Sequence, residues 1–84
     1  MVPHQERMLF WIALAAKQAR QERGRRTAHI AAERYVDQST VTRFETGKAR
    51  EIDVDAMVAA YARDLDLEPI ELWRRALELW EASI

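Results

Sequence analysis

Apolar residues recur at helical spacing along nearly the whole chain, and nowhere do they alternate as they do in a half-buried strand. Residues that begin or end helices separate these runs. Gly24 and Gly47 each follow a run, Thr27 and Asp37 can cap the next ones, and Pro69 suits a first helical turn. The sequence therefore predicts an all-α fold with five helices, over about residues 5–23, 27–34, 38–46, 54–65 and 69–82.

Length and composition limit what such a chain can be. With 84 residues it can bury one hydrophobic core, so residues 1–84 are expected to form a single domain. It has no cysteine, and only His4 and His29 could serve as soft metal ligands, so we expect neither a metal nor a cofactor. The longest apolar stretch, residues 8–16, is well short of the roughly 18 residues that a membrane span needs. We expect no contact with a membrane.

The charges are unevenly distributed, although the whole chain carries only −1. Up to residue 50 there are ten basic and five acidic residues, a net charge of +5. From residue 51 onward three basic residues stand against nine acidic ones, a net charge of −6. Such asymmetry fits a protein with one side facing a polyanion, and it also fits two ordinary solvated faces.

The middle of the chain predicts two short helices joined by a tight turn. Ala31 is small where the two helices must cross, and Val41 and Phe44 lie one turn apart on the inner face of the second helix. This is the pattern of a helix-turn-helix, whose second helix reads base edges in the major groove of DNA. The opposite face of that helix presents polar groups able to reach bases: Gln38, Ser39, Thr42 and Arg43.

The segments 27–31 and 36–47 resemble the lambda-repressor-like (Cro/C1, XRE) family of regulators. The most specific part runs from Ser39 to Gly47, a hydroxyl-rich stretch followed by an aromatic residue, Glu and Gly. The likeness extends from the first predicted helix to the fifth. It implies a five-helix lambda-repressor-like DNA-binding domain whose second and third helices form the helix-turn-helix, and usually a two-fold dimer on a near-palindromic operator.

The resemblance also implies roles for particular residues. Glu45 is expected to be a buried acid paired with Arg20, so that the third helix is clamped to the first. Base contacts are expected from the first positions of the third helix and from one turn later, at Gln38, Ser39, Thr42 and Arg43. Residues that flank this face, together with the backbone amide of Thr27 at a helix start, are the candidate phosphate contacts. They are Arg25, Arg26, Thr27, Thr40, Lys48 and Arg50.

Two positions depart from the family pattern. The family commonly opens the second helix with Gln, but this chain has Thr27, which we expect to be too short to brace Gln38. The family often has Gly in the turn, where this chain has Tyr35. A bulky residue at positive φ is strained, so either the turn is reshaped or Tyr35 carries the strain.

The last predicted helix carries more apolar surface than a monomer comfortably hides. Its stripe is Ile70, Trp73, Leu77 and Trp80. We expect a homodimer through this stripe, and residues 8–11 are candidates to join the interface. The alternative is that the stripe only closes the core over the first and fourth helices.

The sequence therefore favours a cytoplasmic, nucleoid-associated regulator that binds double-stranded DNA, most simply a repressor of phage or mobile-element origin. The alternative is an antitoxin or adaptor of the same fold, whose acidic second half binds a protein partner. An enzyme is not expected, because no nucleophile with a base and no pair of carboxylates stands at a suitable spacing.

Overall fold

The computed structural model describes the backbone of residues 4–48 and 52–84 and the side chains of residues 8–48 and 52–84. These residues form five α-helices and no strand: α1 (His4–Glu22), α2 (Thr27–Arg34), α3 (Gln38–Glu45), α4 (Val54–Leu65) and α5 (Pro69–Ala82). The predicted all-α class and the five helices are confirmed, with ends that differ from the prediction by at most one residue. None of the five helices is both long and apolar enough to span a bilayer.

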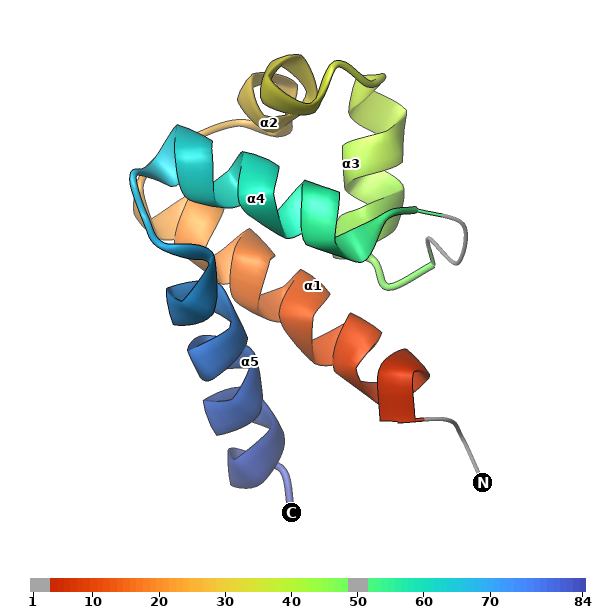
Figure 1. Ribbon diagram of the computed structural model, residues 1–84, viewed down its shortest axis with the longest axis vertical. Coiled ribbons are helices and arrows are strands. Elements are labelled where there is room, and N and C mark those ends of the chain that lie inside the picture. Colours follow the sequence, from red (N-terminus) through yellow and green to blue (C-terminus); the bar gives the residue numbers. More distant parts are fainter. Residues whose placement is uncertain (1–3, 49–51) are drawn as a thin grey trace.

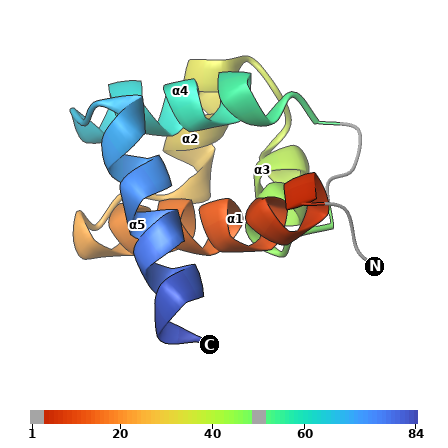
Figure 2. The same cartoon turned by 60° about the horizontal axis from the view of Figure 1, so that its bottom comes forward.

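Helix α1 is the element on which most of the others pack. It contacts α3, α4 and α5, whereas α2 contacts α3 and α4 (Figure 1). In Figure 2, α4 lies above α1, and α5 crosses α1 away from α3. Within the described residues α3 and α5 do not touch. Each of these two helices therefore keeps one side against the body and one side toward solvent.

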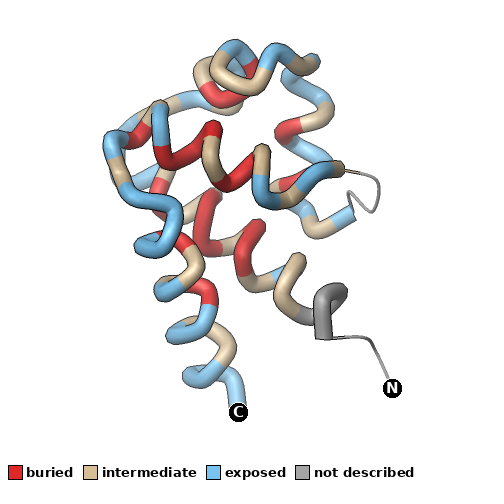
Figure 3. The backbone as a smooth tube through the Cα atoms, in the orientation of Figure 1, coloured by how far each residue is buried: buried red, intermediate tan, exposed pale blue. Residues whose placement is uncertain are grey.

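The core lies between α1 and α4 and extends to the inner sides of the other helices (Figure 3). Helix α1 contributes Ile12 and four alanines, whose small side chains let neighbouring helices approach closely. The largest fully buried side chains are Tyr61 and Phe44, whose ring centroids lie 5.6 Å apart. Trp11 and Trp73 are half-buried and pack against this core.

The helix ends follow the sequence in part. Gly24 and Gly47 have φ of 65° and 73°, as expected for glycines that end helices. The expectation that Thr27 caps α2 is wrong, because Arg26 is the cap residue and His29 Nδ1 accepts a hydrogen bond from its backbone N–H at 3.0 Å. Asp37 does precede α3, but its side chain makes no capping bond. Asp53 caps α4, because its side chain accepts a hydrogen bond from the Ala56 amide.

Candidate functional site

The two faces of α3 differ as the sequence predicts. Val41 and Phe44 have no exposed surface. On the other side the four predicted base-contacting residues, Gln38, Ser39, Thr42 and Arg43, are all exposed, and Thr40 is half-buried beside them. A short helix anchored by two apolar residues thus presents an amide, two hydroxyls and a guanidinium to solvent.

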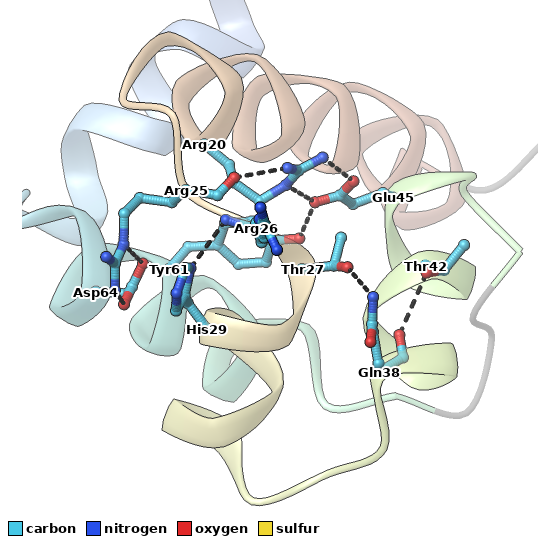
Figure 4. A network of polar contacts seen from close by, with 10 residues as sticks. All are labelled: Arg20, Arg25, Arg26, Thr27, His29, Gln38, Thr42, Glu45, Tyr61 and Asp64. Atoms are coloured by element: carbon cyan, nitrogen blue, oxygen red, sulfur yellow. Dashed lines mark hydrogen bonds and ion pairs between the residues drawn. The ribbon is translucent and has the colours of Figure 1, made fainter.

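A hydrogen bond joins this face to the start of α2 (Figure 4). Gln38 Nε2 donates to Thr27 Oγ1 at 2.8 Å. The expectation that Thr27 is too short to brace Gln38 is therefore wrong, since the longer Gln38 side chain spans the gap. One turn later, Thr42 Oγ1 donates to the Gln38 carbonyl at 3.3 Å, which leaves the oxygen lone pairs of Thr42 free to accept.

A network of three side chains fixes α3 to the rest of the fold (Figure 4). Arg20 of α1 donates to both oxygens of Glu45, from Nε at 2.7 Å and from Nη2 at 2.9 Å. The expected ion pair is present, with side chains only 13% and 6% exposed. The sequence did not reveal the third member, Tyr61 of α4, whose hydroxyl donates to Glu45 Oε2 at 2.5 Å. The carboxylate of Glu45 therefore joins α1, α3 and α4.

The protonation of this network follows from its burial and bonding. Burial, and then the hydrogen bond to Glu45, raises the pKa of Tyr61 far above that of a free phenol. The hydrogen bond to Glu45 likewise raises the pKa of Arg20. Both shifts favour the protonated forms that donate to Glu45.

Arg25, a predicted phosphate contact, has a partner within the protein. Its Nε and Nη2 donate to the two carboxylate oxygens of Asp64 on α4, at 3.0 and 2.8 Å. The Asp64 side chain is only 6% exposed, and the hydrogen bond from Arg25 lowers the pKa of this carboxyl. A second bridge, Arg63 to Glu33 at 3.1 Å, also joins α4 to α2. The main role of Arg25 in the fold is therefore to hold the start of α2 against α4.

The remaining predicted phosphate contacts are placed differently. Arg26 and Lys48 are exposed, at the start of α2 and just after α3. Thr27 is half-buried at the start of α2. Arg50 lies outside the described residues. Among the described residues no three His, Asp or Glu side chains gather closely enough to hold a metal ion.

Tyr35 carries the strain that the sequence suggested. It follows α2 in the left-handed region, with φ 60° and ψ 45°, so the turn is not reshaped to avoid positive φ. Its side chain is 95% exposed and rests on nothing that would favour a tyrosine there. The left-handed residue lets the Val36 amide bond back to the Ala31 carbonyl at 3.0 Å and turns the chain into α3.

The apolar stripe of α5 is divided between core and solvent. Trp73 and Trp80 are half-buried, whereas Ile70 and Leu77 are 58% and 44% exposed. The fully buried residues of this helix, Leu72 and Ala76, lie on its other side. The alternative that the stripe only closes the core therefore fits Trp73, which packs against the core, better than it fits Ile70 and Leu77.

Comparison with known proteins provides no relative for this site: no protein-family model matches the chain, and neither a curated protein nor a solved structure is similar to it.

Proposed function

We propose that the protein is a sequence-specific, double-stranded-DNA-binding transcriptional regulator of the repressor type. In this proposal α2 and α3 form a helix-turn-helix within a lambda-repressor-like fold, and α3 enters the major groove. The observation that carries the proposal is the outward polar face of α3. Gln38 and Arg43 are exposed there, while Val41 and Phe44 are wholly buried behind them.

The chemistry of the exposed groups suits base edges. A Gln amide can accept from N6 and donate to N7 of adenine, and a guanidinium can donate to O6 and N7 of guanine. The bond to Thr27 occupies only one of the two N–H groups of Gln38. The side-chain oxygen and the second N–H of Gln38 remain for a base, with the amide held in one orientation.

The surroundings of α3 supply what a groove-reading helix needs. Arg26, just before α2, and Lys48, just after α3, are exposed and can contact phosphates. Three hydrogen bonds to the Glu45 carboxylate hold the end of α3 against α1 and α4, so the exposed side chains sit on a rigid support.

The alternative is an antitoxin or adaptor that binds a protein partner through the acidic half of the chain. It has less support than the net charge of that half suggests. Asp64 is paired with Arg25, and Asp53 caps α4. Some of the acidic residues from residue 51 onward therefore stabilise the fold itself, and their presence does not require a second protein.

Selection of binding sites from random DNA duplexes tests the proposal directly. We expect a defined sequence to be enriched. On that sequence Arg43→Ala should cost about 1–3 kcal/mol of binding free energy and relax the preference at one base pair. Arg26→Ala is the matched comparison, because loss of a phosphate contact weakens all sequences alike and lowers the salt dependence by about one counterion.

Two results would contradict the proposal. One is the absence of any enriched sequence for a protein whose helical content shows that it is folded. The other is an equal loss on selected and random duplexes for both Arg43→Ala and Arg26→Ala, since base reading and phosphate contact would then not be separable.

A further inference from the structure

The peptide group between Arg25 and Arg26 lies just before α2, and side chains hold both of its polar atoms (Figure 4). Its carbonyl oxygen, on Arg25, accepts from Arg20 Nη1 at 2.8 Å. Its N–H, on Arg26, donates to His29 Nδ1 at 3.0 Å. The His29 amide in turn donates to the Arg26 carbonyl at 3.0 Å. Two bonds in opposite directions therefore close the first turn of α2.

The bond from Arg26 to His29 requires a ring that is unprotonated at Nδ1. A neutral imidazole has one nitrogen that donates and one that accepts, and this bond uses the acceptor. An imidazolium donates from both nitrogens, so protonation would turn a ring N–H toward the N–H of Arg26. Histidine is the side chain whose charge ordinarily changes between pH 5 and 8. Mild acid therefore removes the acceptor that closes this turn.

The charged groups around the ring are engaged with one another. His29 is half-buried and lines an open pocket between α2 and α4. Asp64 is bonded to Arg25 in this pocket, and Glu33 is bonded to Arg63. Each of the two carboxylates thus has an arginine partner already. No charged side chain of α3 or α1 lines the pocket, and the charged and titratable groups around the ring are Arg25, Arg26, Glu33, Tyr35 and Asp64.

The same turn of α2 carries the residue that orients Gln38. Thr27 is the first residue of α2, and its Oγ1 accepts from Gln38 Nε2 at 2.8 Å. A change in the backbone of this turn therefore moves the acceptor to which the Gln38 amide is bonded. Arg26, a proposed phosphate contact, belongs to the same turn.

We propose that neutral His29 positions the start of α2, and through Thr27 the side chain of Gln38, and that protonation of His29 releases both. His29 is then a positioning residue, which need not touch DNA itself but makes base reading by Gln38 depend on pH. The release of α2 concerns the fold alone, whereas the effect on Gln38 rests on the proposed DNA binding.

Thermal melts at about pH 7.5 and about pH 5 test the release of α2. His29→Gln is the matched variant, because Gln at the third position of a helix can accept the same amide bond and does not titrate. Loss of a capping bond lowers the melting temperature of a domain of this size by about 4–8 °C. We expect the parent to lose that much more in acid than His29→Gln loses. The comparison cancels the other titrating groups, which both proteins share.

His29→Lys provides the opposite control, since it is charged and has no acceptor. It should melt below the parent at about pH 7.5 and show no extra loss at about pH 5. An equal loss in acid for the parent and His29→Gln would overturn the proposal. A parent that gains stability over His29→Gln in acid would also overturn it, because Asp64 would then hold the charged ring in place.

An NMR titration of the parent is independent of any variant. The Arg26 amide proton should lose its hydrogen-bonded chemical shift along the same curve on which the His29 ring takes up its proton. An Arg26 amide that does not follow the ring would refute the role given to this bond.

Base preference at the same two pH values tests the step to Gln38. On selected duplexes the parent should lose about fivefold of its discrimination at one base pair in acid, the low end of what a bidentate contact provides, and His29→Gln should keep it. A change in affinity for all duplexes alike is a separate effect, because a charged ring near phosphates strengthens binding to any sequence. Equal discrimination by the parent at both pH values would overturn the link from His29 to Gln38.

The outcome is distinguishable from a failure of the proposed DNA binding. A protein that shows the expected melts and the expected Arg26 titration, but binds no DNA sequence, upholds the role of His29 in the fold and overturns the proposed function alone.

Discussion

Removing the hydroxyl of Tyr61 isolates one bond of the network that anchors α3. In Tyr61→Phe the ring stays in the core beside Phe44, and only the O–H that lies 2.5 Å from Glu45 Oε2 is lost. Glu45 keeps both bonds from Arg20, so no charge is left alone. A hydrogen bond to a charged group contributes about 1.5–3 kcal/mol. We expect the free energy of unfolding to fall by that amount, a large part of the roughly 5–15 kcal/mol of a typical domain.

Arg20→Met provides the comparison for this bond. It removes the counterion of a carboxylate that is only 6% exposed, and breaking a buried pair by removing one partner costs about 3–5 kcal/mol. Both changes act on Glu45, so their costs should not add in the double variant. A larger loss from Arg20→Met than from Tyr61→Phe is the expected order.

Urea unfolding followed by both tryptophan fluorescence and helical circular dichroism measures these differences. Coincident transitions and an unchanged denaturant slope would show that the variants unfold in one step from the same native state. A cost below about 0.5 kcal/mol for Tyr61→Phe would place it among ordinary surface changes and would refute the role given to this hydroxyl.

Three other variants probe single features of the structure. Tyr35→Gly relieves a left-handed residue whose side chain packs on nothing, so the free energy of unfolding should rise by about 0.5–1 kcal/mol in thermal melts, whereas Tyr35→Phe should leave it unchanged. Asp64→Asn should destabilise the protein at neutral pH. Arg25 lowers the pKa of this carboxyl in the folded state, so its stabilisation is present above the unfolded pKa of about 3.9 and is lost as the pH falls further. The difference in unfolding free energy between the parent and Asp64→Asn should therefore shrink in acid, and a constant difference would contradict the pairing. Thr27→Val removes the acceptor for Gln38 at nearly constant volume and should weaken the preference of selected DNA at one base pair, whereas Thr27→Ser should keep it. Equal base preferences in both Thr27 variants would show that Thr27 does not orient Gln38.

The sequence predicted the helices because their signals are local. Gly24 and Gly47 end helices through their own backbone freedom, and apolar residues at helical spacing mark a buried side without any knowledge of the neighbours. The exposed face of α3 followed from the positions of Val41 and Phe44 alone. Resemblance to a family, and not spacing, supplied the pair of Arg20 with Glu45.

The contacts that the sequence missed join residues far apart in the chain. Arg25 and Asp64 are 39 residues apart, and either could have remained in solvent had α2 and α4 packed at another angle. Tyr61 was expected on the apolar side of α4, and only its position beside Glu45 shows that its hydroxyl has an acceptor. The sequence analysis did not predict the hydrogen bond between Thr27 and Gln38, because Thr27 is short. The longer Gln38 side chain spans the distance between the two helices. In each case the angle between two helices decides the contact, and that angle depends on the whole core.

The division of α3 into an anchored side and an outward side separates folding from surface chemistry. Val41, Phe44 and Glu45 hold the helix, and none of these three belongs to the exposed face. Exchanges among polar residues at Ser39 or Arg43 should therefore cost little stability. A library randomised at such positions would remain largely folded, so the chemistry of this face, and with it the target of the proposed DNA binding, could be re-engineered or could drift in evolution without rebuilding the scaffold beneath it.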